Sequence, residues 1–272
     1  MLESHVLQAV LAFLAGLLIG SFLNVCVYRL PRDLSVVRPR SHCPACEKQI
    51  DWYDNIPVAS YFLLGGRCRH CKARIPLRYL MVELATAAAF VICVVALGPT
   101  LPALKWAVLS AILITLTATD IEERILPDEF TLGGAAVGLA LAAVVPIDAG
   151  VVTYFLSGAL GLRMASVAEA LVSAWVAGGA IWLVGWLYQK LRHREGMGFG
   201  DVKMIAMIGA FLGFQETLLT LILASVLGSV TGLAYVWITK KDMATYELPF
   251  GSFIGAAGLV VALWGHVLRT QS

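Results

Sequence analysis

The segment that decides the fold class is residues 105–120, KWAVLSAILITLTATD. Between the terminal Lys105 and Asp120 it carries no charged residue. Such a run favours a membrane-spanning helix, because a lipid interior offers backbone N–H and C=O groups no partner outside the chain itself. Asp120 closes the run, where the helix would meet water. A carboxylate near a bilayer is costly and is usually kept for function, so Asp120 is a candidate functional residue.

Apolar runs recur along the whole chain. Of its 272 residues, 59% are hydrophobic and 14% are charged, whereas a soluble domain carries about a quarter charged residues. We therefore expect an all-α membrane protein, a polytopic bundle of about eight transmembrane helices. The expected spans lie near 6–28, 79–97, 103–119, 129–146, 167–188, 216–238 and 249–268, with the shorter run 202–214 counted as the eighth. The apolar stretch 151–162 is interpreted as interfacial or as part of a loop.

Lysine and arginine are unevenly distributed between these spans. The segment 29–78 holds ten of the twenty. Cytoplasmic loops carry an excess of both residues, which predicts a cytoplasmic insert at 29–78 and both termini outside. The chain then divides into a first transmembrane helix at 1–28, the insert at 29–78, and a transmembrane bundle at 79–272. No internal repeat is apparent.

Four of the six cysteines form two C-x-x-C pairs inside the insert, Cys43 with Cys46 and Cys68 with Cys71. Two such knuckles supply four thiolates at tetrahedral angles, which suits a structural Zn(II) site with no open position. Two disulfides, disfavoured on a reducing cytoplasmic face, and reduced free thiols are the weaker interpretations, and an iron site with the same four ligands is the stronger rival. A small insert has little core of its own, so a metal would supply stability.

A second candidate carboxylate is Asp201, in the run Gly198-Phe199-Gly200-Asp201. Glycine permits positive φ and close backbone approach, so Gly198 and Gly200 are expected to form an active-site turn, with Lys203 nearby. Alternatively, Asp201 caps the N-terminus of the following helix. The topology places Asp120 and Asp201 at the same membrane boundary, which favours an acid/base pair over a cap.

Several other acidic residues flank these positions. Asp128 is expected to cap a helix, with Pro127 just outside it. Glu122, Glu123 and Glu129 are either solvated loop charges or an acidic rim that attracts a basic peptide, and the sequence leaves both open. Glu83 is interpreted as a charge near a helix start.

The motifs together resemble a known family, the prepilin peptidases or type IV leader peptidases. The resemblance covers nearly the whole chain and rests on combined motifs rather than on any single one. They are Gly20-Ser21-Phe22-Leu23-Asn24-Val25, Tyr28-Arg29-Leu30-Pro31, the cysteine tetrad, 51–57, 67–71, Arg78-Tyr79, Glu83, Asp120, Leu126-Pro127-Asp128, 198–204 and Pro249-Phe250-Gly251.

This resemblance implies a GxGD-type intramembrane aspartic endopeptidase of the bacterial inner membrane, with Asp120 and Asp201 catalytic. The implied substrates are prepilins or pseudopilins of type IV pilus and type II secretion systems, which carry a basic leader and an apolar N-terminal helix. Cleavage at the cytoplasmic face would be followed by N-methylation of the new terminus with S-adenosyl-L-methionine. No residues for that cofactor are identified. Lipid surrounds the bundle, and no nucleic-acid partner is expected.

Proteolysis also agrees with elementary chemistry. Hydrolysis of a peptide needs an activated water and a proton for the leaving amine, and two close carboxyls share one proton. Helix dipoles favour an ionised Asp201 and a protonated Asp120. The alternatives are a peptidase without methyl transfer, a proton-coupled transporter with carboxylates near mid-membrane, and a structural assembly protein, which would leave both aspartates unexplained.

Overall fold

The computed structural model describes the backbone of residues 2–148, 150–192, 198–239 and 249–268. Within these ranges the chain forms ten α-helices and no strand. Short 3₁₀ turns at Leu30–Arg32 and Trp52–Asn55 and a π-helical segment at Leu263–Leu268 complete the pattern. The helices are α1 (Leu2–Arg29), α2 (Ala59–Leu63), α3 (Leu77–Leu97), α4 (Leu101–Glu123), α5 (Asp128–Val144), α6 (Val151–Leu160), α7 (Leu162–Arg192), α8 (Phe199–Leu212), α9 (Phe214–Thr239) and α10 (Phe250–Ala262).

Five of the described helices, α1, α3, α4, α7 and α9, are long and apolar enough to cross a membrane. The prediction of an all-α membrane protein is confirmed. The other three predicted spans correspond to α5, α8 and α10, which have 17, 14 and 13 residues. They are short for an independent crossing, so the count of eight stays a prediction. Residues 151–162 contain the ten-residue helix α6.

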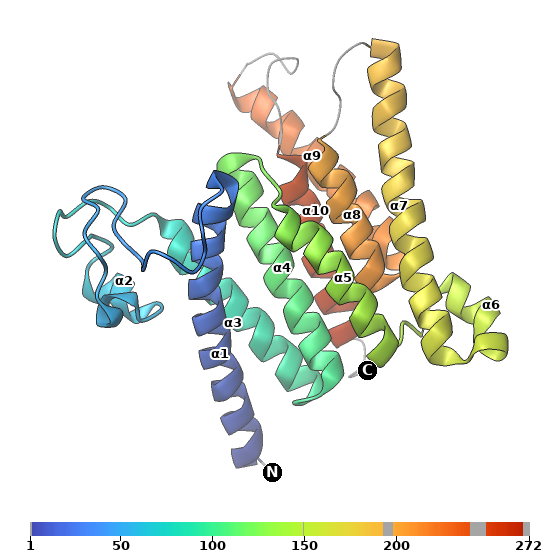
Figure 1. Cartoon of the computed structure of the whole chain (residues 1–272), viewed down its shortest axis with the longest axis horizontal. Helices are drawn as coiled ribbons and strands as arrows, with labels where there is room; N and C mark the ends of the chain where they lie inside the picture. The colour runs from blue at the N-terminus through green and yellow to red at the C-terminus, as the bar shows by residue number, and fades with distance from the viewer. Residues whose placement is uncertain (1, 149, 193–197, 240–248, 269–272) are drawn as a thin grey trace.

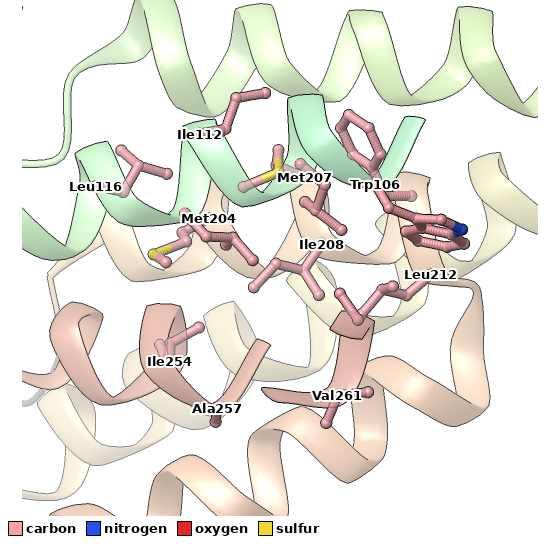
Figure 2. Packing of buried hydrophobic residues seen from close by; sticks show 14 of the residues in the cluster. Trp106, Ile112, Leu116, Met204, Met207, Ile208, Leu212, Ile254, Ala257 and Val261 are labelled. Atoms are coloured by element: carbon pink, nitrogen blue, oxygen red, sulfur yellow. The ribbon is translucent and has the colours of Figure 1, made fainter. Parts of the chain in front are cut away.

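The bundle is organised around α8. From Met204 to Leu212 every residue except Ala206 is buried, and the side chains of α8 lie between those of α4 and α10 (Figure 2). Met204 and Ile208 pack there with Leu113 and Ile254. A short helix is tolerated at membrane depth when protein, rather than lipid, surrounds it. The burial of α8 therefore explains how its first turn, which carries Asp201, can begin inside the bundle.

The helices alternate in direction, so polar connections gather at one end. The C-terminal ends of α1, α4 and α7 and the N-terminal ends of α5, α8 and α10 lie toward the upper end in Figure 1. The insert leaves α1 at this end and projects beside it (Figure 1). Asp120 and Asp201 thus come from helix ends on one side of the bundle.

Close backbone contact holds α1 against α3, the two helices that carry the insert. A Cβ at Gly20 would lie 2.7 Å from the Cα of Glu83, so only glycine fits there. Polar contacts then fix the insert itself. The buried Arg29 guanidinium donates to the carbonyls of Ser35 at 2.8 Å and Pro39 at 2.7 Å.

Candidate active site and metal centre

Asp120 lies in the last turn of α4 and is 6% exposed. The helix ends because Arg124 adopts a left-handed conformation, with φ 55° and ψ 33°, and returns its N–H to the Asp120 carbonyl. Both the backbone N–H and the hydroxyl of Ser252 donate to Asp120 Oδ2, at 2.5 and 2.6 Å. The first turn of α10 therefore caps the carboxylate of a helix 132 positions away in the chain.

Asp201 is the third residue of α8 and is 9% exposed. The helix begins at Phe199, with Gly198 in the N-cap position. The alternative N-cap role for Asp201 is therefore wrong, because the helix starts two residues earlier. The Asp201 N–H donates to the Gly198 carbonyl at 3.1 Å, so residues 198–201 form the first turn of α8, and the active-site role of Gly198 and Gly200 stays a prediction. Gly198 has φ −69°, so it does not use a left-handed conformation. Free N–H groups in the first turn favour a carboxylate at this position.

Gly200 instead allows close packing. A Cβ on Gly200 would lie 3.1 Å from the Leu126 Cβ. A Cβ on Gly251 would lie 3.1 Å from both Asp120 Oδ2 and Leu126 Cδ1. Leu126 thus packs against the starts of α8 and α10 together, which brings the two aspartates to one place.

Because Gly200 and Gly251 both pack against Leu126, and Gly251 also lies against Asp120 Oδ2, the two predicted catalytic carboxylates lie at one junction of α4, α8 and α10. Ser252 occupies Asp120 Oδ2, but no donor among the described residues hydrogen-bonds Asp120 Oδ1 or the Asp201 carboxyl. Half-satisfied carboxyl groups at a buried helix junction retain acceptor positions for a water molecule or a peptide. The arrangement can therefore perform acid/base chemistry on a bound polar group.

Lys203 lies next to this pair but is engaged elsewhere. Its ammonium contacts Asp128 Oδ1 at 2.6 Å and lies over the Phe199 ring. Asp128 is the first residue of α5, and Pro127 holds the N-cap position. The expectation that Asp128 caps this helix is therefore wrong, since its carboxylate joins α5 to α8 through Lys203.

The acidic residues after Asp120 also have partners from the insert side. Glu122 pairs with Arg78 of α3 at 2.8 Å. Glu123 pairs with Arg32, just after α1. Of the three glutamates considered as an acidic rim for a basic peptide, two thus join the end of α4 to the helices that carry the insert.

The four cysteines of the insert come together as predicted. Their sulfur atoms all lie within 4.8 Å of one another, and Cys43 Sγ is 3.8 Å from Cys71 Sγ. Tetrahedral zinc with Zn–S bonds of about 2.3 Å implies S–S separations of about 3.8 Å. Backbone N–H groups of Cys71 and His70 lower the pKa of the Cys68 thiol to about 7, which favours the thiolate. The sulfur geometry and the lowered pKa of the Cys68 thiol both fit a metal held by four thiolates.

The two knuckles are copies of one another, contrary to the expectation of no internal repeat. Cys43 N–H donates to the Lys48 carbonyl and Cys68 N–H to the Ala73 carbonyl, each at 2.9 Å. The matching residues Glu47 and Lys72 both have positive φ, 57° and 60°. The pattern C-x-x-C-x-x-x-I recurs at 43–50 and 68–75. This eight-residue repeat is too short to detect from apolar periodicity, but the matching backbone hydrogen bonds of Cys43 and Cys68 make the repeat clear.

Glu83 has a larger role than that of a charge at a helix start. It is 7% exposed, and its Oε2 accepts the Val58 N–H at 2.7 Å. Val58 has φ 61° and ψ −51°, an unfavourable conformation for a β-branched residue. Glu83 therefore fixes the start of α2 onto α3. It positions the insert against the membrane bundle.

Comparison with known proteins identifies the family. Residues 14–97 match the model described as bacterial peptidase A24 N-terminal domain, and residues 107–233 match the type IV leader peptidase family. A protein of Pseudomonas putida named prepilin leader peptidase/N-methyltransferase is 35% identical over 96% of this chain and 92% of its own length. Proteins of the same name from Pseudomonas aeruginosa and Stutzerimonas stutzeri are 34% and 35% identical, each over 99% of this chain and at least 95% of their own lengths. The chain belongs to the type IV leader peptidase family. No solved structure matches it.

The sequence argument missed two residues of this leader peptidase: Ser252, which contacts a predicted catalytic aspartate, and Glu169, a buried structural carboxylate. Ser252 binds Asp120 but lies in an ordinary small-residue run, and only the motif Pro249-Phe250-Gly251 just before it gave a signal. Glu169 is fully buried in α7 and accepts from four donors. An isolated carboxylate inside an apolar run could have flagged Glu169.

Proposed function

We propose that this chain is a bifunctional membrane enzyme. It cleaves the basic leader of type IV prepilins and pseudopilins, and it then N-methylates the new N-terminal residue. The names of the relatives support both activities. The observation that carries the proteolytic half is that buried Asp120 and Asp201 lie at one junction at one end of the bundle, with oxygen atoms left for water.

The two aspartates divide the work of peptide hydrolysis. One ionised carboxylate takes a proton from water while the protonated carboxyl polarises the scissile carbonyl. Two Ser252 donors stabilise a charge on Asp120, each worth about 1.5–3 kcal/mol when the acceptor is charged. Helix-dipole effects at either aspartate are worth about 0.3–1 kcal/mol. The hydrogen bonds from Ser252 contribute more free energy than the helix dipoles, so Asp120 is the ionised base and Asp201 carries the shared proton. This is the reverse of the assignment from sequence.

The proton-coupled transporter explains the geometry less well. It requires carboxylates near mid-membrane, between paired broken helices. Asp120 and Asp201 instead lie in terminal turns of α4 and α8, at the end from which the insert projects (Figure 1). Their position suits a substrate bond that enters from one aqueous face.

The membrane part and the metal-binding part occupy separate segments of the chain. Residues 1–28 and 79–272 form the membrane part, and 29–78 form an insert that holds Zn(II). All four ligands come from the protein, so the zinc is structural. The insert faces the cytoplasm in the bacterial inner membrane, where lipid contacts the apolar bundle and the prepilin presents its basic leader beside its apolar helix.

The zinc assignment has a direct test. Purified protein should contain about one zinc per chain, as a closed four-thiolate shell requires. Cys43→Ser and Cys71→Ser should each lose the metal and expose the insert to protease before they alter the membrane bundle. Fully active protein that contains no zinc would contradict the assignment.

Mass spectrometry tests both activities together. Purified protein is incubated with a prepilin and S-adenosyl-L-methionine, which supplies the methyl group. Cleavage removes the leader mass, and methylation adds one methyl to the shortened chain. Asp120→Asn and Asp201→Asn should leave the prepilin uncut. A wild-type protein that folds, binds zinc and leaves the prepilin intact would overturn the proposal.

A further inference from the structure

The last turn of α4, which carries Asp120, extends beyond the apolar core that packs the preceding turns. Helices α1, α3 and α4 share a buried cluster that includes Val27, Val82 and Ala118. Ala118 precedes Asp120 by two residues, whereas no side chain of residues 121–123 is buried. Carbonyl groups in a final helical turn lack partners within the helix. This turn therefore depends on contacts from outside α4.

Two ion pairs reach this turn from the helices that carry the insert. Arg78 Nη1 of α3 lies 2.8 Å from Glu122 Oε2, and Arg32, just after α1, pairs with Glu123. Consecutive residues are about 100° apart around a helix, so the two ion pairs constrain α4 from different directions. Together they fix the orientation of the turn that contains Asp120.

Arg78 is committed to its contact with Glu122. The Arg78 side chain is 12% exposed, and its guanidinium carbon lies 4.6 Å from the Tyr79 ring centroid. Neither its Nε nor its Nη1 has an aligned hydrogen bond among the described residues, so charge attraction to Glu122 holds the group. Removal of the partner of a buried ion is strongly destabilising. A shift of the α4 terminus away from α3 would therefore leave Arg78 without its counter-charge.

Arg32 is also anchored, at the end of α1. Its Nη1 donates to the Tyr28 carbonyl at 2.7 Å, and its guanidinium carbon lies 4.4 Å from the Tyr28 ring centroid. Its Nη2 donates to Glu123 Oε1. Arg32 is thus fixed to α1 through one nitrogen and to α4 through the other. Two cations that are anchored on different helices give the end of α4 one preferred position.

We propose that Arg32 and Arg78 are positioning residues for proteolysis, which keep Asp120 in its reactive position by holding the last turn of α4. The proposal rests on the peptidase activity proposed above. The N–H and Oγ of Ser252 hold one oxygen of Asp120 at 2.5 and 2.6 Å. A displacement of about 1 Å along these contacts would take both beyond hydrogen-bond range. Misplacement of this size can lower a rate by about 10²-fold, so the arginines act on kcat without contact with the substrate.

Two other roles for the ion pairs give different kinetic signatures. If Glu122 and Glu123 attracted a basic leader, removal of the arginines that neutralise them would lower KM. If the ion pairs served stability alone, kcat per folded molecule would stay unchanged. A positioning role predicts a lower kcat with an unchanged KM.

Prepilin cleavage by the full chain, measured per folded molecule, tests the proposal. Arg32→Gln and Arg78→Gln should each lower kcat about tenfold, and the double variant about 10²-fold, with KM unchanged within about twofold. Arg69→Gln is the matched control, because it removes the same charge and breaks an ion pair with Asp54 that lies inside the insert. Its kcat should match the wild type. Zinc content reports whether each variant keeps its insert folded. Wild-type kcat in both Arg32→Gln and Arg78→Gln, or a change in KM alone, would overturn the proposal.

Charge exchange separates the effect of the ion pair from that of the arginine itself. Arg32→Glu places like charges together and should lower kcat. Combination with Glu123→Arg restores opposite charges and should recover most of the rate. This pair suits the exchange because both side chains are partly exposed to solvent. Equally low kcat in the single and exchanged variants would contradict the proposal.

Hydrogen exchange reports the order of the turn without turnover. Amide hydrogens of residues 121–124 should exchange faster in Arg32→Gln and Arg78→Gln, whereas those of residues 204–212 in α8 should keep their rates. A fall in kcat with unchanged exchange at 121–124 would refute the positioning role. A wild-type protein that leaves the prepilin uncut would instead refute the proposed peptidase, so the two failures are distinguishable.

Discussion

Two buried carboxylate sites lie toward opposite ends of the bundle, and they differ in how fully their oxygens are satisfied (Figure 1). Glu169, near the start of α7, is fully buried. Its Oε2 accepts the N–H groups of Val152 and Thr153, at 2.6 and 3.2 Å. Its Oε1 accepts the Ser173 hydroxyl and the Phe214 N–H, at 2.9 and 3.0 Å. This carboxylate joins the starts of α6 and α9 to α7.

The Asp120–Asp201 site is the less satisfied of the two. Only Oδ2 of Asp120 accepts protein donors among the described residues. A carboxylate whose acceptor positions are all filled contributes stability and has no lone pair to offer a substrate. One with open positions is ready to bind water. The number of carboxylate acceptor positions filled by donors, rather than burial or membrane depth alone, therefore separates the structural carboxylate of Glu169 from the reactive pair of Asp120 and Asp201.

The largest expected effect comes from matched amide substitutions at the two sites. Asp201→Asn should lower kcat for prepilin cleavage by about 10³-fold or more, because a positioned acid or base contributes about 10²–10⁴. Glu169→Gln, the same change at the other site, should leave kcat per folded molecule within a few-fold. Assays at equal folded concentration check both. Comparable loss of kcat in the two variants would remove the distinction between the sites.

Infrared difference spectra of the aspartate variants sharpen the comparison. If Ser252 keeps Asp120 ionised, the band of the protonated carboxyl should survive Asp120→Asn and disappear in Asp201→Asn. The pair titrates as a unit, so the band reports a dominant microstate. The opposite pattern would restore the assignment based on helix dipoles alone.

Thermal stability should rank the two amide variants in the opposite order to kcat, with the larger loss in Glu169→Gln. In Glu169→Gln, the amide group faces two of the four donors, and each unsatisfied donor costs about 1–3 kcal/mol. We expect the melting temperature in detergent to fall by roughly 5–15 °C. Asp201→Asn should leave it nearly unchanged, since it replaces a protonated, neutral carboxyl with a neutral amide and orphans no described donor. A melting temperature of Glu169→Gln equal to that of wild type would contradict its structural role.

These sites also show what sequence reasoning can reach. The spacing of the cysteine pairs is local, so the tetrad was predictable, and Asp120 and Asp201 stand out against apolar runs. The contact of Ser252 with Asp120 joins residues 132 positions apart and has no local pattern. At the start of α8, Gly200 packs against Leu126, a tertiary contact that helix propensity does not encode. Tertiary contacts therefore decided the helix boundaries and the partners of each carboxylate.

Removal of a single donor should have a smaller effect than removal of either aspartate. Ser252→Ala deletes the hydroxyl that contacts Asp120 but keeps the backbone N–H. A hydrogen bond to a charged group is worth about 1.5–3 kcal/mol, so kcat should fall about tenfold or more. Ser252→Thr keeps a hydroxyl and should recover most of the rate. If alanine and threonine reduce kcat equally, steric fit against α4 matters rather than the hydrogen bond.

The smallest expected effect concerns the acids outside the catalytic pair. Glu122 and Glu123 pair with Arg78 and Arg32, whereas Glu129 is exposed and has no ion pair within the described part of the chain. Glu129 is therefore the acid best placed to attract a basic leader. Exposed ion pairs are worth about 0.2–1 kcal/mol, so Glu129→Gln should raise KM by about two- to fivefold at low ionic strength.

Salt dependence identifies the cause of any such rise in KM. Screening shortens the range of charge interactions to about 3 Å at 1 M salt, so the difference between Glu129→Gln and wild type should vanish there. Glu123→Gln is the matched control, because its charge already has a partner in Arg32. An unchanged KM for Glu129→Gln at low salt would show that the Glu129 charge does not attract the substrate, and would contradict the idea of an acidic rim at this position.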